Sequence, residues 1–418
     1  MKDSGIEWIG EIPEGWRTIN PKALFTQRKD KAQKGERQLT SSQQYGILYQ
    51  DDYMELTGSK VVTVEKDFDI LKHVEAGDFV ISMRSFQGGL EYSTKSGAIS
   101  SAYVMLVPNL ELVYPRFYRW LLKSSVYIDA LQRTTNMVRD GQAMRYSNFA
   151  QVRLFTLPLD EQKSRADFLD LECSSIDKIL FKTRSSIEEY KKLKQAVITQ
   201  AVTKGVRGER EMKDSGVEWI GEIPKEWDIL DLVAHTSMLT PMRDRPENLD
   251  GPIPWIRIED FDGKYISSSK ASLGVSKETV RSMNLKIYPV GTILCTSSCI
   301  MGKCAIVSRE LVSNQRFIGI IPDQNTCENF LYYLMLSNSE RMNYLATGAL
   351  QANLSRSSFE HLKVQFPSYQ EQKEISDYLD TKCAEIDKLI AKKEQLVKEL
   401  ESYKKSLIYE VVTGKREV

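Results

Sequence analysis

The chain contains an internal repeat, and this repeat constrains the fold more than any other feature of the sequence. Residues 1–16 and 212–227 are identical at 13 of 16 positions, at an offset of 211. A second repeated block follows, because residues 161–203 match residues 371–413 at 16 of 43 positions, at an offset of 210. The order along the chain is therefore an opening segment, a variable region and a repeated block, followed by the same three again.

The two variable regions, residues 17–157 and 228–366, resemble each other only faintly. A tandem duplication has therefore kept its frame while its two middle regions diverged. Duplication for structure alone gives no reason for the middles to differ most, whereas two domains that read different targets on one frame do. We divide the chain into two domains with their opening segments and two spacers: 1–157, 158–211, 212–366 and 367–418.

The second repeated blocks have the periodicity of long helices. Pro158 and Pro367 precede acidic residues near the expected helix starts. Beyond them, apolar residues fill the a and d positions of five heptads in matching register, which is typical of a coiled coil. Two amphipathic helices that pack separately on their own domains are the alternative. The expected seam includes Leu169, Ile176, Leu180, Ile187, Leu379, Ile386, Ile390 and Val397.

The connections predict that the two helices are antiparallel. The first helix is expected to end near Thr203, because Gly205 and Gly208 follow. The second opening segment begins almost at once, so the second domain is expected at the far end of the first helix. If that domain is compact with its ends close together, the second helix runs back beside the first. Helices of this length would span roughly 65 Å and hold the two domains at a fixed separation.

Each variable region predicts a mixed α/β domain. Helical spacing of apolar residues indicates helices at 117–132 and from 330 to 336. The fold class is therefore α/β (mixed α+β), with two domains joined by an antiparallel coiled coil and related by a pseudo-two-fold duplication. Apolar, β-branched stretches indicate strands at 61–64, 79–82, 102–107, 152–157, 291–294, 304–307, 317–321 and 362–366.

Charge and composition exclude several classes of protein. The 57 Lys and Arg residues balance 57 Asp and Glu residues, which excludes a protein held on nucleic acid by overall charge alone. Residues 17–157 carry 19 basic and 14 acidic side chains, whereas residues 228–366 carry 14 of each, so only the first region is basic. No apolar run approaches the ~18–20 residues of a membrane helix, and the first residues lack a signal-peptide core. With six scattered cysteines, we expect a cytoplasmic protein with no membrane contact.

Three local patterns together indicate a family. The segment Trp-Ile-Gly-Glu-Ile-Pro, closed by a second Trp, occurs at 8–16 and 219–227. Residues 348–355 form a Gly-Ala-Leu-Gln-Ala-Asn-Leu-Ser loop before an expected strand, and a helix entry with Glu-Gln-Lys and Ile-Asp-Lys also occurs twice. Over nearly all of its length, the chain resembles the specificity (S) subunit of type I restriction–modification enzymes. Residues 141–145 depart from the fuller loop, which weakens the transfer of individual contacts to the first domain.

The resemblance implies two target-recognition domains, each of which reads a few base pairs of an asymmetric, split site in double-stranded DNA. It also implies that the helical pair sets the gap between the half-sites and docks two modification (methyltransferase) subunits. Those partners would use S-adenosylmethionine to methylate adenine, and restriction (translocase and nuclease) subunits would add ATP- and Mg-dependent translocation and cleavage. The chain itself would bind no cofactor and would contribute recognition and assembly.

The residues themselves agree with a non-catalytic role. The sequence has no G-x-x-x-x-G-K-[ST] phosphate loop, no G-x-G-x-x-G after a strand, and no Asn/Asp-Pro-Pro-Tyr/Phe stretch of the kind found in adenine methyltransferases. Residues 160–163 resemble part of a nuclease site, but they stand at a helix start, where acidic residues favour the dipole. The alternatives are a self-contained DNA methyltransferase or nuclease, and a coiled-coil adaptor that binds proteins only.

Candidates for DNA contact follow from side-chain chemistry. Arg, Asn and Gln read base edges well, and Arg and Lys bind phosphates. Surface residues of these types are more often simply solvated, so each assignment is a hypothesis. The candidates are Arg84, Gln87, Arg145, Tyr146, Arg243, Arg245, Lys303, Gln351, Asn353 and Arg356.

Two further groups of residues have a structural and a functional interpretation. The repeated tryptophans, Trp8, Trp16, Trp219 and Trp227, are expected to pack each opening segment against a helix, with a partner surface as the alternative. A zinc site is the alternative for the cysteines at 295, 299, 304 and 327, but their spacing departs from that of paired zinc ligands. We therefore expect buried thiols there and no bound metal.

Overall fold

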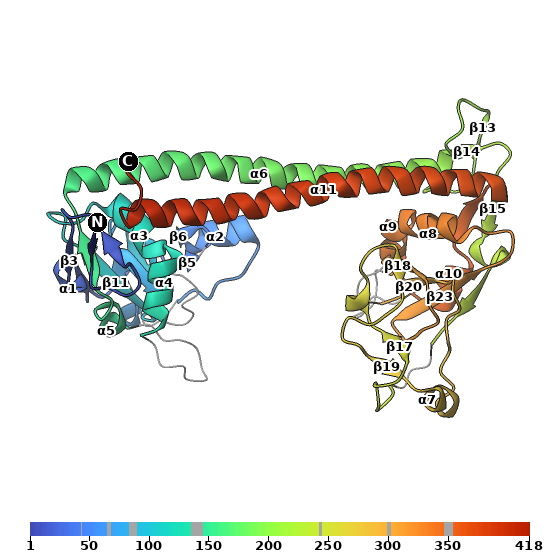
Figure 1. Ribbon diagram of the computed structural model, residues 1–418, viewed down its shortest axis with the longest axis horizontal. Coiled ribbons are helices and arrows are strands. Elements are labelled where there is room, and N and C mark those ends of the chain that lie inside the picture. Colours follow the sequence, from blue (N-terminus) through green and yellow to red (C-terminus); the bar gives the residue numbers. More distant parts are fainter. Residues whose placement is uncertain are drawn as a thin grey trace. The chain divides into compact units, whose positions relative to one another are not determined.

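The computed structural model describes residues 1–42, 44–64, 68–82, 90–134, 145–241, 245–298, 302–346 and 354–418 (Figure 1). Its contacts divide the chain into two compact units. Unit 1 contains residues 1–184 and 395–418, and unit 2 contains residues 185–394. The long helices α6 (Leu159–Lys204) and α11 (Tyr369–Val412) each begin in one unit and end in the other. The division into two recognition domains and two separate spacers stays a prediction.

Unit 1 is built around a four-stranded antiparallel sheet in the order β4-β11-β8-β9, with small two-stranded sheets beside it. Its strands are β1 (Lys2–Asp3), β2 (Glu11–Ile12), β3 (Arg17–Ile19), β4 (Phe25–Arg28), β5 (Leu39–Ser42), β6 (Gly46–Tyr49), β7 (Lys72–Val74), β8 (Phe79–Ser82), β9 (Leu90–Tyr92), β10 (Gly97–Ile99), β11 (Tyr103–Pro108) and β12 (Leu154–Thr156). Its shorter helices are α1 (Pro21–Leu24), α2 (Gln50–Thr57), η1 (Phe68–Ile70), α3 (Pro115–Lys123), α4 (Ser125–Gln132) and α5 (Tyr146–Phe149).

Unit 2 contains a five-stranded sheet in the order β16-β23-β20-β21-β18, antiparallel except for the parallel pair β18–β21. Its strands are β13 (Met212–Asp214), β14 (Glu222–Pro224), β15 (Asp228–Asp231), β16 (Thr236–Leu239), β17 (Ile253–Ile256), β18 (Tyr265–Ile266), β19 (Gly274–Val275), β20 (Ile293–Thr296), β21 (Cys304–Val307), β22 (Val312–Ser313), β23 (Phe317–Pro322) and β24 (Lys363–Phe366). Its shorter helices are η2 (Leu232–Ala234), η3 (Ile258–Asp260), α7 (Lys277–Ser282), α8 (Glu328–Ser337), α9 (Ser339–Leu345) and α10 (Arg356–Glu360).

The duplication extends into the regions whose sequences have diverged. The order β4-β11-β8-β9 of unit 1 recurs in unit 2 as β16-β23-β20-β21. The antiparallel pair β3–β12 recurs as β15–β24, and the opening hairpin β1–β2 recurs as β13–β14. The two variable regions therefore have the same topology although their side chains differ. The predicted mixed α/β fold with long paired helices is confirmed.

Two predicted elements of unit 1 differ in the structure. Residues 61–64 are not a strand, because the Gln38 side chain takes the place of a neighbouring strand: its amide donates to the Val64 carbonyl at 2.7 Å and accepts from the Val64 N–H at 2.9 Å. The predicted helix 117–132 is two helices, α3 and α4. Ser124 between them adopts an extended conformation, and its hydroxyl donates to the Leu121 carbonyl at 2.7 Å.

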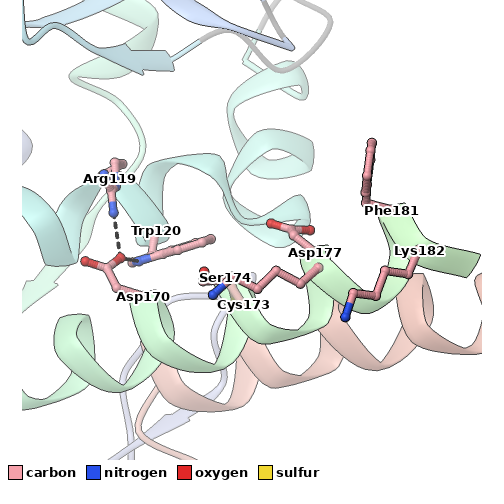
Figure 2. Close-up of a pocket in the computed structure, with 9 residues that line it drawn as sticks. Arg119, Trp120, Asp170, Cys173, Ser174, Asp177, Phe181 and Lys182 are labelled. Carbon is pink, nitrogen blue, oxygen red and sulfur yellow. Dashed lines mark hydrogen bonds and ion pairs between the residues drawn. The ribbon is translucent and has the colours of Figure 1, made fainter. Parts of the chain in front are cut away.

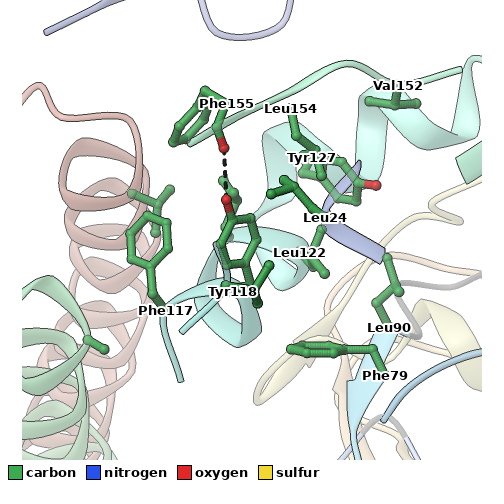
Figure 3. Packing of buried hydrophobic residues seen from close by; sticks show 14 of the residues in the cluster. Leu24, Phe79, Leu90, Phe117, Tyr118, Leu122, Tyr127, Val152, Leu154 and Phe155 are labelled. Atoms are coloured by element: carbon green, nitrogen blue, oxygen red, sulfur yellow. Dashed lines mark hydrogen bonds between the residues drawn. The ribbon is translucent and has the colours of Figure 1, made fainter. Parts of the chain in front are cut away.

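Aromatic side chains fill the core of unit 1 between the sheet and helices α3 and α4 (Figure 3). Tyr118 is fully buried on α3, and its hydroxyl donates to the Phe155 carbonyl at 2.9 Å. Phe25 packs edge-on against Tyr118 and Phe79, with ring centroids 5.5 and 5.4 Å away. The Tyr118 hydrogen bond satisfies a polar group that would be costly to bury alone, and it ties α3 to the last strand before α6.

The long helices pack along the predicted seam within each unit. In unit 1, Leu407 and Val411 near the end of α11 join the core cluster that holds Leu169 and Ile176 near the start of α6. In unit 2, the end of α6 packs with the start of α11 in the same way. The helices are therefore antiparallel, as predicted. Of the predicted seam residues, Ile390 and Val397 are half-buried, and the buried ones are Leu169, Ile176, Leu180, Ile187, Leu379 and Ile386.

Candidate nucleic-acid interface

A repeated tryptophan joins each opening segment to the start of a long helix. The indole N–H of Trp16 donates to the Glu161 carboxylate at 3.1 Å, and that of Trp227 donates to Glu371 at 3.0 Å. Both tryptophans are 1% exposed. The prediction that these two residues pack the opening segments against the helices is therefore confirmed.

The other two repeated tryptophans have different surroundings in the two units. Trp8 is half-buried, and its indole N–H donates to the Arg153 carbonyl at 3.3 Å. Trp219 is 43% exposed, with the Arg341 guanidinium 4.1 Å from its ring centroid. Packing of the opening segment thus accounts for Trp8 and leaves one face of the second opening segment partly exposed.

The glutamine that follows each of these glutamates fixes the chain on both sides of the domain. Gln162 donates to the Leu157 carbonyl at 2.9 Å and accepts from the Tyr114 N–H at 2.7 Å. Gln372 makes the equivalent bonds, to the carbonyl before α11 and from the Cys327 N–H at 2.7 Å. Tyr114 and Cys327 are the N-cap residues of α3 and α8. One glutamine side chain therefore joins the end of the domain's last strand to the start of α3 in unit 1, or of α8 in unit 2.

A third repeated residue, an aspartate two turns further along each helix, also binds its domain. Asp170 accepts hydrogen bonds from Arg116 at 2.9 Å and from Trp120 at 2.7 Å, both on α3. Asp380 accepts from Tyr333 on α8 at 2.6 Å. Burial would raise the pKa of Asp170, but the hydrogen bonds from Arg116 and Trp120 outweigh it and lower that pKa. The repeated blocks are thus the surface on which each domain is mounted.

Two lysines of the seam form equivalent ion pairs between the helices. Lys404 lies 2.6 Å from Asp177 in unit 1, and Lys194 lies 2.7 Å from Asp387 in unit 2. The residue numbers of the two pairs add up to the same total, as expected for one antiparallel register. Polar residues at seam positions can fix register, and these pairs give that role a specific partner in each unit.

Four strand ends meet at one edge of the main sheet in unit 2, and we call this edge the loop end. The strand ends are Leu239 of β16, Thr296 of β20, Cys304 of β21 and Phe317 of β23, which the sheet register makes neighbours. In unit 1, the equivalent ends are Arg28, Ser82, Leu90 and Tyr103. Segments that leave the ends of adjacent strands present side chains side by side, and binding residues are common on such rigidly held loops.

The loop end of unit 2 brings several predicted residues together. The Thr296 N–H donates to the Lys303 carbonyl at 2.9 Å, and the next residue, Ser297, donates to the Arg316 carbonyl at 2.8 Å. The N–H of Leu354, near the end of the predicted loop 348–355, donates to the Ser297 carbonyl at 2.9 Å. Three segments that are far apart in sequence therefore converge here.

The individual candidates have different surroundings. Arg145 and Lys303 are exposed, whereas exposed Arg356 forms an ion pair with Glu360 at 2.7 Å. The Tyr146 hydroxyl donates to the Phe25 carbonyl at 3.1 Å, and burial raises its pKa, so it serves the fold. No observation tests their contact with DNA, which stays a prediction. Five candidates lie outside the described residues: Arg84, Gln87, Arg243, Gln351 and Asn353.

A hollow of about 240 Å³ at the loop end contains residues that the sequence reasoning missed. Arg245 was predicted, but Arg257 and Arg316 line the same hollow with Asn314 and Gln315. A usable signal was present, because Asn314-Gln315-Arg316 directly precedes an expected strand and all three are base-reading residue types.

A groove of about 610 Å³ lies where α3 meets α6 in unit 1 (Figure 2). Arg119 and Trp120 point from α3 toward Asp170, while Phe181 stands out from α6 and is 74% exposed. Cys173, a seam residue of α6, also lines this groove, and burial raises the pKa of its thiol to about 11. That thiol is therefore a poor nucleophile, and the groove offers apolar and charged contacts instead of chemistry.

The remaining cysteines of interest are buried. Cys295 and Cys304 face each other across β20 and β21 with their sulfur atoms 2.9 Å apart, and Cys327 is buried at the start of α8. Cys299 lies outside the described residues. Among the described residues, no helix combines the length and the apolar character needed to cross a membrane.

Together, the fold and the loop ends define a class of protein: two similar domains, mounted identically on a shared antiparallel helix pair, that present different side chains from the same strand ends. A family model described as "Type I restriction modification DNA specificity domain" matches residues 225–399. Over these residues, which are less than half of the chain, the chain resembles type I restriction–modification specificity subunits.

Individual relatives show the same similarity. The MjaIX specificity subunit of Methanocaldococcus jannaschii is 34% identical over 179 residues, which are 41% of this chain and 41% of that protein. The putative MjaX specificity subunit of the same organism is 23% identical over 97% of this chain and 95% of its own length. The match to the first of these relatives thus spans less than half of its length.

Solved structures show the same fold. A chain from a structural study of complex assembly and conformational transition in the type I restriction–modification system superposes with a TM-score of 0.74 at 12% identity, covering 97% of this chain and 100% of that chain. The HsdS subunit from Thermoanaerobacter tengcongensis superposes with a TM-score of 0.50 at 12% identity, covering 97% and 98%.

Proposed function

We propose that this chain is the DNA-reading subunit of a type I restriction–modification complex. Each unit reads one half of a split, asymmetric site in double-stranded DNA, and helices α6 and α11 dock two modification subunits. The observation that carries the proposal is the contrast within the duplication: the residues that mount each domain recur, whereas the residues at the loop ends differ. A reader of two different half-sites on one frame requires this pattern.

Mapping methylated adenines tests the proposal. The chain is assembled with its modification subunits, S-adenosylmethionine and a random DNA library, and the modified sites are sequenced. We expect adenines within a site of two short, different half-sequences separated by a gap of fixed length. Modification at a palindromic or uninterrupted site would contradict the split-site reading.

Two alternatives give different results in the same system. A self-contained methyltransferase or nuclease would turn over DNA when the purified chain is supplied with S-adenosylmethionine or Mg²⁺ and no partner. A coiled-coil adaptor would assemble with the partners without adding duplex binding. We expect no turnover by the chain alone, and salt-dependent duplex binding by the complex that is lost when this chain is omitted.

The cofactors belong to the partner subunits in this proposal. S-adenosylmethionine serves the modification subunits, and ATP and Mg²⁺ serve restriction subunits that add translocation and cleavage. The groove beside α3 and α6 supports the docking of a modification subunit in unit 1, because exposed Phe181 offers an apolar anchor there. We expect Phe181→Ala to weaken the pull-down of the modification subunit, and Lys178→Ala to weaken it less.

The helical pair also sets the gap between the half-sites. This role is supported by the lengths of α6 and α11, which are 46 and 44 residues, and by their shared antiparallel register. Inserting one heptad into each helix keeps the seam in phase. Methylation mapping should then return a longer gap between unchanged half-sequences. Changed half-sequences with an unchanged gap would contradict this role.

A further inference from the structure

The hollow at the loop end of unit 2 is lined by three arginines together with apolar and amide side chains. Arg245 comes from the segment after β16, Arg257 follows β17, and Arg316 directly precedes β23. Trp255 also lines the hollow and is 2% exposed. Three cationic forks from three separate segments therefore surround one space of about 240 Å³.

Among the described residues, few acidic side chains compensate the charge in this hollow. Arg257 forms an ion pair with Glu259 at 3.1 Å. Within the described ranges of the chain, no carboxylate forms an ion pair with Arg245 or Arg316, and both are exposed. Guanidinium groups repel one another unless an acceptor lies between them, so the hollow is suited to a ligand with paired acceptor atoms.

The backbone of Arg316 is held by two hydrogen bonds. Its N–H donates to the Asn314 side chain at 3.0 Å, and its carbonyl accepts from Ser297 at 2.8 Å on the neighbouring strand end. The next residue, Phe317, is buried and paired with Thr296 in the sheet. The backbone of Arg316 is thus fixed, and its exposed side chain starts from a defined point.

The same backbone position in unit 1 carries no arginine. The strand β11 starts at Tyr103 as β23 starts at Phe317, so Ala102 is equivalent to Arg316 and Ser100 to Asn314. The turn is also repeated, because the Ala102 N–H donates to the Ser100 hydroxyl at 3.3 Å. One turn therefore presents a guanidinium in unit 2 and a methyl group in unit 1, which is the difference expected at a position that determines specificity.

We propose that Arg316 determines specificity by reading the edge of a guanine in the half-site bound by unit 2. Its fork would donate to the O6 and N7 atoms in the major groove, the commonest specific arginine contact. Arg245 and Arg257 would keep the site electropositive. The inference rests on the proposed function. Guanine fits better than a phosphate because the arginine is rigidly placed and flanked by Asn314 and Gln315, two further base-reading side chains.

Methylation mapping with the assembled complex tests the role of Arg316. For Arg316→Ala and Arg316→Lys, we expect discrimination at one guanine position of one half-site to fall roughly 10- to 100-fold. The other half-sequence and the gap should stay as in the unaltered complex. Arg309→Ala is the matched control, because Arg309 is exposed in unit 2, lies outside the hollow and donates to the Pro252 carbonyl. It should leave all positions unchanged.

Several results would overturn the proposal. Uniformly weaker binding to all sequences, with a shallower salt dependence, would make Arg316 a phosphate contact. An unchanged site for Arg316→Ala would also overturn it, and Arg316→Lys provides a second variant if Arg316→Ala does not fold. The same experiment distinguishes the proposed function from the guanine contact. If the unaltered complex reads no split site, the proposed function fails, whereas a split site that survives Arg316→Ala overturns the guanine contact alone.

Discussion

The two units share a backbone at their loop ends but fill it with different chemistry. In unit 1, the hollow beside Ser100 and Ala102 has a volume of about 350 Å³, and among the described residues no arginine lines it. In unit 2, the hollow beside Asn314 and Arg316 is smaller and three arginines line it. At the helices the relation is reversed, because the same tryptophan, glutamate, glutamine and aspartate recur in both units.

This contrast separates the residues that hold each domain on the long helices from the residues that can bind a ligand. The mounting residues recur because each makes several bonds at once, so a change in one would disturb a strand, a helix and an opening segment together. Most loop-end residues are free to change because strand pairing, helped by one turn-forming side chain in each unit, holds the backbone in place. The units also differ in one mounting detail: the Glu371 side chain is 2% exposed, whereas that of Glu161 is 32% exposed.

The largest expected effect comes from the seam, which should be equally important in both units. Leu169 and Leu379 are equivalent and fully buried, so Leu169→Ala and Leu379→Ala should each destabilise the chain by about 3 kcal/mol. Hydrogen exchange resolves the loss to unit 1 and unit 2 respectively. Leu171→Ala is the control, because Leu171 is 67% exposed and its loss should cost less than about 0.5 kcal/mol. Equal costs for Leu169 and Leu171 would contradict the seam.

The next effect should differ between the units. Trp16→Phe and Trp227→Phe keep an aromatic ring but remove the hydrogen bond to a glutamate, which is worth about 1.5–3 kcal/mol. We expect the larger loss in unit 2, because water reaches Glu371 less than Glu161. Urea unfolding of both variants measures this, with Trp219→Phe as the exposed control. A larger loss for Trp16→Phe would show that burial of the glutamate does not set the strength of the joint.

A third comparison uses pH. The pKa of Asp170 is lowered in the folded chain, so its contribution to stability is present above its ordinary value of 3.8 and is lost as the pH falls through the lowered pKa. Asp170→Asn should therefore cost about 1 kcal/mol at pH 7, and the difference from the unaltered chain should shrink toward pH 3. Arg116 and Arg119 remain partly hydrated, which keeps the cost modest.

Asp380→Asn provides the counterpart in unit 2. Its partner Tyr333 is deeply placed, and burial raises the pKa of the tyrosine hydroxyl. That hydroxyl stays protonated and remains a donor across the accessible pH range. Denaturant unfolding of both variants at pH 7 and pH 3 makes the comparison. For Asp170→Asn, a difference that grows on acidification would contradict the role of the ionised Asp170 carboxylate.

Sequence reasoning succeeded where a periodic pattern or a repeat carried the information. The heptad pattern identified the seam, and the apolar stretch at 304–307 coincides with β21, because burial on both faces leaves a continuous apolar run. It failed where a single side chain decides the local structure. The amide of Gln38 replaces a strand partner for residues 61–64, and Ser124 breaks a helix whose apolar spacing continues across it.

The loop end was only partly predictable for a related reason. Arg245, Arg257 and Arg316 are separated by up to 71 positions, and only the strand register brings them together. Conversely, Tyr146 is of a residue type that can contact DNA, but its hydroxyl donates a hydrogen bond to the Phe25 carbonyl. Side-chain type therefore selects candidates, whereas the contacts of each side chain decide which remain available to a ligand.

The smallest expected effect compares two arginines at the starts of the corresponding helices α5 and α10. Arg145 stands before α5, and no carboxylate of the described residues pairs with it, whereas Arg356 opens α10 and is paired with Glu360. If both face DNA, Arg145→Ala should lower the salt dependence of complex binding by about one phosphate contact, and Arg356→Ala by less. Arg17→Ala removes the same charge from β3, outside the main sheet of unit 1, and should leave the slope unchanged. Equal slopes for all three would show that the charge at these helix starts is not used for DNA, leaving the difference between the loop ends to base-edge contacts alone.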